Sequence, residues 1–135
     1  MSATPTTLRA DHASALRVGV VAAIVVAAVA HVPVIGPHLE EAPYMGVLFV
    51  ALTAVCLTLG AAIAATNRTW AYASAAGVCG AAVVAYAATR LVAFPQLADD
   101  VGNWFEPLGV ISVASESMVV ALSLVVLGRR HAARA

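Results

Sequence analysis

The chain is poor in charge. Only 10% of its 135 residues are charged, lysine is absent, and the formal net charge is zero. The helices of a soluble four-helix bundle are polar over more than half of each turn, so this composition argues against a soluble bundle. Basic patches that would indicate a nucleic-acid partner are also missing.

Apolar residues make up 62% of the chain, and they gather in four stretches. Each stretch is nearly free of charge and close to the roughly 20 residues that a spanning helix needs. The sequence therefore predicts an all-α, four-transmembrane-helix bundle in a lipid bilayer, with residues 1–135 forming one integral membrane domain. The predicted spans are 18–36, 45–66, 70–94 and 107–128, with tails at 1–17 and 129–135.

The arginines predict the orientation. Six of the seven lie in the two tails or in the turn between the second and third spans, and basic residues favour the cytoplasmic side. We therefore expect both termini in the cytoplasm and the two remaining, acidic connections outside. The abundance of alanine and arginine is typical of a GC-rich bacterial genome and favours a bacterial plasma membrane. The six arginines are Arg9, Arg17, Arg68, Arg129, Arg130 and Arg134.

The first span allows two interpretations. Its Ala28-Val29-Ala30 sequence fits a signal-peptide cleavage site. The apolar character resumes at 32–35, which favours an intact helix that ends near Gly36. Pro33 and Pro37 are expected to interrupt this helix and to bend its exit segment.

Ionisable residues within or near the spans are the candidate functional residues. His31 and Arg90 are each expected about one turn below the outer ends of their helices, and Glu106 begins the fourth helix at the same level. An arginine at this depth either pairs with an acid or extends to the headgroups. By depth, Glu106 is its first candidate partner and Glu116 its second.

Glu116 lies ten residues into the fourth span, about 15 Å from its start. A carboxyl group there is expected to be neutral unless Arg90 or a bound cation compensates its charge. Ser112 lies one turn outward, and Tyr86 lies one turn below Arg90. Together these four side chains form either a proton or cation path, or the hydrogen-bond partners that make one buried acid tolerable.

A second hypothesis is a metal site. A bent exit segment would bring His38 and Glu41 back over His31, and two imidazoles with a carboxylate suit zinc or copper. The alternative is that both histidines lie at the interface and bind nothing. No second intramembrane histidine faces His31, which argues against a b-type haem.

Cys56 and Cys79 are expected to face each other at mid-depth. Buried cysteines usually act as small packing residues, although two thiols with Met118 also suit Cu(I). The outer connections contain no cysteine, so no disulfide is expected there. Small residues recur every four positions at Ala73, Gly77 and Ala81, a spacing that favours close helix packing within the bundle, in a homo-oligomer or in a larger membrane complex.

The outer-layer residues also carry a resemblance. The stretch His31-Val-Pro…His38-Leu-Glu-Glu-Ala-Pro-Tyr-Met-Gly-Val-Leu-Phe, with Thr89-Arg90 and Trp104-Phe105-Glu106-Pro107-Leu108-Gly109…Glu116, resembles a group of small actinobacterial multi-pass membrane proteins of unknown function. It covers most of the chain from residue 31 to about 117 and implies an actinobacterial source. It implies no substrate or reaction.

Two function classes follow. In the first, the outward polar residues bind a metal ion, a proton or a small molecule. In the second, the protein is a non-catalytic accessory or assembly subunit whose polar residues fasten its helices. Enzymatic activity is disfavoured, because the chain has no nucleophile motif, phosphate loop or cofactor fingerprint.

Overall fold

The computed structural model describes residues 5–135, with side chains described from residue 12 onward. It forms a bundle of four helices, α1 (Pro5–Glu41), α2 (Pro43–Thr66), α3 (Thr69–Leu91) and α4 (Pro107–Ala132), with a short 3-10 helix η1 (Ala98–Asp100). All four long helices are long and apolar enough to cross a membrane. The predicted all-α fold is therefore confirmed. The side chain of Arg9 lies outside the described part.

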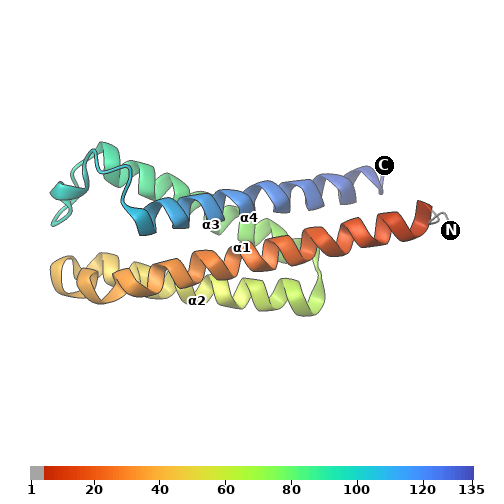
Figure 1. Ribbon diagram of the computed structural model, residues 1–135, viewed down its shortest axis with the longest axis horizontal. Helices are drawn as coiled ribbons and strands as arrows, with labels where there is room; N and C mark the ends of the chain where they lie inside the picture. The colour runs from red at the N-terminus through yellow and green to blue at the C-terminus, as the bar shows by residue number, and fades with distance from the viewer. Residues whose placement is uncertain (1–4) are drawn as a thin grey trace.

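Successive helices run antiparallel (Figure 1). Helix α1 packs most extensively against α2, α4 packs against both α1 and α3, and α2 touches α3 least. The start of α1, the end of α4 and the Asn67–Arg68 turn lie at one end of the bundle, which we call the terminal end. Ala42 and residues 92–106 lie at the other, which we call the loop end.

Helix α1 corrects the first predicted span. It continues through Pro33 and Pro37 as far as Glu41, instead of ending near Gly36 in a bent exit segment. Each proline removes one backbone hydrogen bond, but neighbouring helices and side chains in a transmembrane bundle can compensate for such a loss. The predicted outer connection is therefore mostly helical. The extension also places His31 ten residues from the end of its helix rather than about one turn from it.

The corner between α1 and α2 is a single residue, the fully buried Ala42. Pro43 begins α2, where a missing N–H costs nothing. A Cβ atom on Gly46 would lie 2.7 Å from the backbone nitrogen of Leu39. Only glycine therefore allows the two helices to approach this closely at the corner.

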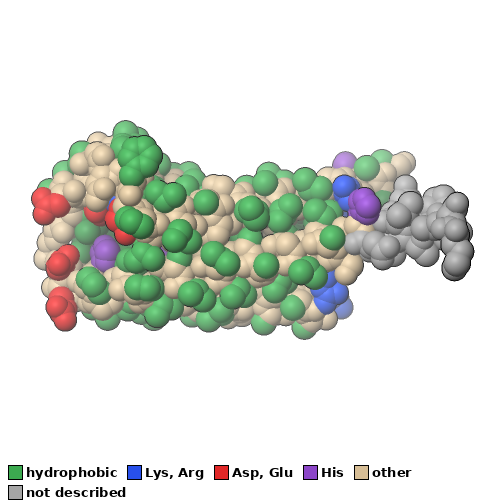
Figure 2. Space-filling model, viewed as in Figure 1, with side chains coloured by type: hydrophobic (Ala, Val, Ile, Leu, Met, Phe, Trp, Pro, Cys, Tyr) green, Lys and Arg blue, Asp and Glu red, His purple; other side chains and the backbone are tan. Residues whose placement is uncertain are grey.

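The described core consists of small and branched apolar residues, and the outer surface is equally apolar. Figure 2 shows hydrophobic side chains over the whole middle of the bundle, with acidic groups at the loop end and cations at the terminal end. Val84 and Leu91 are 69% and 68% exposed. Such a surface suits lipid, where exposed apolar groups have no cost. The largest fully buried apolar side chains are Val20, Ile24, Ile63, Tyr72 and Val119.

The terminal end is fastened by polar contacts around the Asn67–Arg68 turn. Asn67 ends α2 in the left-handed conformation, with φ 49°. Its side-chain oxygen accepts hydrogen bonds from Arg130 at 2.7 Å and from the Tyr72 hydroxyl at 2.7 Å. Arg130 also donates to Thr69 at 3.1 Å. These contacts tie the last turns of α4 to the turn between α2 and α3.

Candidate functional site

A cavity of about 550 Å³ lies at the loop end, between all four helices. It lies where α2 and α3 make few contacts with each other and where the small side chains of Ala81, Ala82 and Ala85 form part of the α3 wall. Figure 2 shows a hollow at this end with a histidine visible inside it. The polar or aromatic side chains that line the cavity are His31, His38, Phe49, Tyr86, Thr89, Arg90, Asp100, Glu106, Ser112 and Glu116.

Two of these side chains meet deep in the cavity. Nε2 of His31 lies 3.4 Å from Oε1 of Glu116, and the two residues are only 4% and 1% exposed. His31 lies ten residues before the end of α1 at Glu41, and Glu116 lies nine residues after the start of α4 at Pro107. The longer α1 therefore brings His31 to the level of Glu116.

The hydrogen bonds around His31 determine where a proton must lie. Its Nδ1 is 2.7 Å from the carbonyl oxygen of Ala27, which can only accept, so Nδ1 carries a hydrogen. In the neutral ring Nε2 is then an acceptor, and it faces the carboxyl oxygen of Glu116. Two acceptors face each other favourably only with a proton between them. A hydrogen bond between these two atoms would therefore require one proton, carried either by Glu116 or by the imidazole.

Glu116 has no other polar partner at this oxygen. Oε1 is a buried atom for which the described residues offer no hydrogen bond within normal geometry. Ser112, one turn toward the loop end, lines the same wall and is 8% exposed. Its carbonyl oxygen accepts from the hydroxyl of Ser115. Ser112 and Glu116 thus share one cavity wall, as the spacing indicates.

Phe49 lies between the two histidines. The His38 ring meets it edge-on at 4.9 Å, and the His31 ring lies 5.4 Å away with a tilt of 32°. Nδ1 of His38 forms a hydrogen bond with the carbonyl oxygen of Val34 at 2.8 Å. Phe49 was not among the residues that the sequence pointed to, because an aromatic residue in an apolar span gives no distinctive signal.

Glu41 does not join the histidines. It is exposed in the last turn of α1, because this segment stays helical instead of bending back over His31. Among the described residues, no three or more histidine, cysteine or acidic side chains are grouped closely enough to hold a metal ion. The expected His31, His38 and Glu41 ligand set for zinc or copper is therefore not assembled in this structure.

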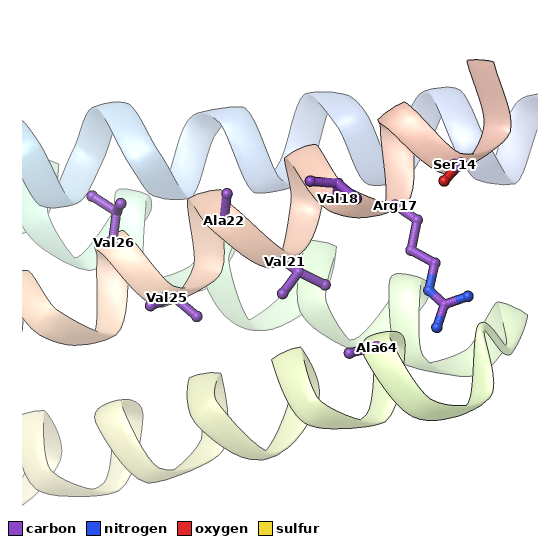
Figure 3. Close-up of a pocket in the computed structure, with 8 residues that line it drawn as sticks. All are labelled: Ser14, Arg17, Val18, Val21, Ala22, Val25, Val26 and Ala64. Carbon is purple, nitrogen blue, oxygen red and sulfur yellow. The ribbon is translucent and has the colours of Figure 1, made fainter. Parts of the chain in front are cut away.

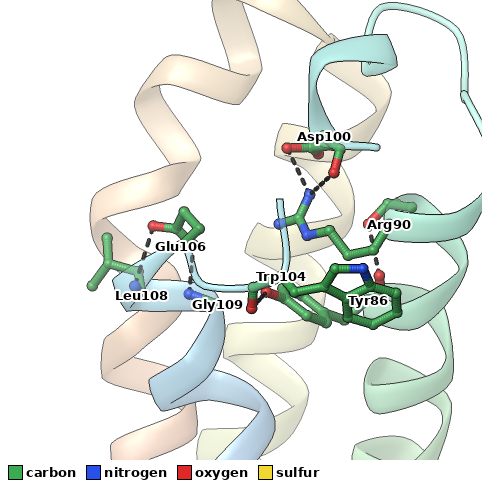
Figure 4. Close-up of polar contacts among 8 residues, drawn as sticks. Tyr86, Arg90, Asp100, Trp104, Glu106, Leu108 and Gly109 are labelled. Atoms are coloured by element: carbon green, nitrogen blue, oxygen red, sulfur yellow. Dashed lines mark hydrogen bonds and ion pairs between the residues drawn. The ribbon is translucent and has the colours of Figure 1, made fainter. Parts of the chain in front are cut away.

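Arg90 pairs with Asp100, not with Glu106 or Glu116. Its Nη1 lies 2.6 Å from the Asp100 carboxylate and 3.3 Å from the carbonyl oxygen of the same residue. Its guanidinium also stacks on the Tyr86 ring at 4.4 Å, and the Tyr86 hydroxyl donates to the carbonyl of Trp104. Figure 4 shows these contacts holding the 92–106 segment over α3. The Nε of Arg90 is buried and has no hydrogen-bond partner in the part of the chain that the structure describes.

Glu106 caps α4. Its two carboxylate oxygens accept from the backbone N–H groups of Leu108 at 3.1 Å and Gly109 at 2.5 Å (Figure 4). A side-chain acceptor here satisfies donors that the first turn leaves free, and its negative charge suits the helix dipole. The expected pairing of Glu106 with Arg90 is therefore wrong, because its oxygens are already engaged.

Cys56 of α2 and Cys79 of α3 are fully buried and free, and both belong to the same apolar core cluster. Met118 is 55% exposed and lies on the surface of α4. The proposed soft-metal set of two thiols and Met118 is therefore not assembled. The cysteines contribute small apolar groups to the core.

A second hollow, of about 640 Å³, runs along α1 near the terminal end. Figure 3 shows that its lining side chains come almost entirely from α1, with Ala64 of α2 closing one side. Among the described residues that line it, Ser14 and Arg17 are polar, and the rest are valines and alanines. These described residues bring no group of converging polar atoms together in the groove.

Comparison with protein families, with curated proteins and with solved structures finds no match for this chain. The geometry of the cavity is therefore the basis for any functional proposal.

Proposed function

We propose that this protein spans a bacterial plasma membrane with both termini in the cytoplasm and binds a small organic molecule in a cavity that opens on the outer side. The orientation is supported by charge. Arginines gather at the terminal end, whereas Arg90, at the loop end, is neutralised by Asp100. Basic residues favour the cytoplasmic side of a membrane. The cavity at the loop end would then face outward.

The unpaired oxygen of Glu116 carries the proposal of binding. An ionisable group in a transmembrane bundle is costly and is usually retained for function. Glu116 is 1% exposed, yet it lines the cavity, and its Oε1 has no partner among the described residues other than the nearby His31. Apolar walls with a few converging polar groups are typical of small-molecule sites. The volume of about 550 Å³ lies within the usual range for such a site.

The test is equilibrium binding of radiolabelled probes to the full chain in mild detergent. The probes share an aromatic body and differ in charge: tetraphenylphosphonium is a cation, triphenylphosphine oxide is neutral and triphenylacetate is an anion. We expect at least one probe to bind saturably. Ala82→Trp fills the cavity and should weaken this binding about tenfold or more.

Ala51→Trp is the matched control, because Ala51 is exposed on α2 and does not line the cavity. It should leave binding unchanged. If Ala82→Trp does not fold, Ala85→Phe fills the same cavity from a more exposed position. The proposal would be refuted if folded wild-type protein bound none of the three probes saturably. It would also be refuted if Ala82→Trp and Ala51→Trp bound the probe equally well.

A second candidate function is an accessory subunit of a larger membrane complex or a homo-oligomer. It is favoured by two structural contacts. Arg90 holds the loop at Asp100 against α3, and Glu106 caps the first turn of α4. The surface of small residues around Gly77 is also open to a partner, since a Cβ atom on Gly77 would meet no other atom within 4 Å. If the protein is an accessory subunit, Glu116→Gln should leave the binding of all three probes unchanged. Replacement of Arg90 should lower the thermal stability of the protein and weaken its association with the partner subunit or with a second copy.

A further inference from the structure

We infer that the ligand of this cavity is an organic cation, and that its binding displaces the single proton held between His31 and Glu116. The inference rests on the proposed binding function and adds to it the charge of the ligand and a coupled proton. It depends on three observations, namely the geometry of the His31–Glu116 pair, the charges of the other groups around the cavity, and the chemistry of its walls.

The pair presents an acceptor to the cavity once its proton leaves. Nδ1 of His31 donates to the carbonyl of Ala27, so the imidazole can be neutral with no lost hydrogen bond. Glu116 would then be a carboxylate whose Oε1 has no other partner among the described residues. A buried carboxylate requires a compensating positive charge. Either the shared proton or a bound cation can supply it.

None of the other titratable groups described around the pair supplies the positive charge that the Glu116 carboxylate would need, so a bound cation can supply it. On α3, Arg90 is neutralised by Asp100 of the loop. On α4, Glu106 is engaged by backbone N–H groups. Among the described residues, the arginine that lines the cavity is thus already paired with an acid, which disfavours an anionic ligand. The remaining titratable groups nearest the pair are His38 on α1, Cys56 on α2, and Cys79 and Tyr86 on α3.

The walls favour an organic cation over a bare metal ion. The rings of Phe49 and Tyr86 line the cavity, and aromatic faces attract cations. No group of three or more metal-binding side chains is present among the described residues. Glu40, Glu41 and Asp99 are exposed at the loop end, and a rim of one charge raises the local concentration of oppositely charged ligands.

The exchange balances in charge and in atoms. As the cation enters, the bond between the shared proton and its host atom breaks, either Oε–H of Glu116 or Nε2–H of His31. The proton leaves to water at the loop end. In the final state His31 is neutral, with its Nδ1–H donated to the carbonyl oxygen of Ala27, and Glu116 is a carboxylate paired with the cation. One positive charge enters and one leaves.

The test is isothermal titration calorimetry of the full chain with tetraphenylphosphonium, in two buffers of equal pH and different ionisation enthalpy. This probe has no titratable proton, so every proton released comes from the protein. We expect release of about one proton per bound cation and an affinity that rises about tenfold per pH unit while the pair holds its proton. Triphenylphosphine oxide, a neutral probe of similar body, should bind more weakly and release none.

Two variants of Glu116 identify the source of the proton. In Glu116→Gln the amide can donate to Nε2 of His31 as the protonated acid does, so the fold should be kept. This variant should bind the cation about tenfold more weakly or worse and release no proton. Glu116→Asp keeps a carboxyl group and should retain proton release. Circular dichroism and size-exclusion chromatography would show that each variant is folded.

The inference and the proposed function can fail separately. Equal affinity for the cationic and neutral probes, or cation binding without proton release, would overturn the inference while leaving the binding function intact. Unchanged cation binding by Glu116→Gln would also overturn it. Loss of saturable binding for all three probes in wild-type protein would overturn the binding function itself.

Discussion

Replacing His31 by phenylalanine should lower the free energy of unfolding, whereas replacing His31 and Glu116 together should restore much of it. Phenylalanine keeps a ring at the position that packs 5.4 Å from Phe49, so the packing changes little. It removes Nε2, the one polar atom near Oε1 of Glu116. The single variant therefore leaves a carboxyl group buried without a partner.

The magnitude follows from burial. A buried polar group that loses its partner costs about 1–3 kcal/mol. Hydrogen bonds between membrane helices average about 0.6 kcal/mol in double-mutant cycles, with a maximum of about 1.7. Glu116 is 1% exposed and Oε1 has no alternative partner, so we expect a value toward the upper end. The coupling energy of His31→Phe and Glu116→Leu should be about 1–2 kcal/mol.

The assay is reversible unfolding of the purified protein in mixed micelles, titrated with dodecyl sulfate and followed by circular dichroism. Wild type, both single variants and the double variant complete the cycle. The double variant should be more stable than the sum of the two single losses predicts. Additivity within about 0.3 kcal/mol would show that the two side chains do not interact, and the argument for a shared proton would then fail.

The remaining predictions concern the loop end and the helix contacts. Asp100→Asn should speed hydrogen exchange in residues 98–104 and cost about 1 kcal/mol or less, because its carboxylate pairs with Arg90 but is 28% exposed. Glu106→Ala should destabilise α4 by about 1 kcal/mol in thermal unfolding, and Glu106→Ser should recover part of this because it keeps a capping oxygen. Gly46→Ala should cost about 1–3 kcal/mol, because its methyl group would overlap the backbone of α1. Gly77→Ala is the matched control and should stabilise α3 by roughly 0.5–1 kcal/mol, since its methyl group meets nothing; an equal loss in both glycine variants would contradict the packing argument.

The lengths of the helices could be predicted well where apolar composition alone sets them. The predicted 45–66 span agrees with α2 to within two residues, and α4 begins at Pro107 as expected. The predicted end of the first helix near Gly36 is wrong, because Pro33 and Pro37 do not end a helix here as they often do in water. In an apolar surrounding, a helix that satisfies its own backbone groups is favoured over an irregular segment.

The sequence allowed the level of each candidate residue along the bundle to be predicted, but not the side chain that it contacts. Counting residues along helices places Glu116, Ser112, Tyr86 and Arg90 at successive levels, and all four line one cavity. The partner of Arg90 was missed because Asp100 lies in η1, where the path of the chain cannot be counted at a fixed rise per residue. Its opposite charge, ten residues after Arg90, was the available signal.

The sequence by itself determined that this chain forms four apolar helices, with most of its acidic residues toward one end of the bundle and most of its arginines toward the other. That follows from composition and from the fixed rise of a helix, which are local properties. Only the tertiary structure decided that His31 meets Glu116, that Arg90 meets Asp100, and that Glu106 caps its own helix. These pairings depend on the rotation of each helix about its axis and on the path of the loop, which are set by packing among all four helices at once.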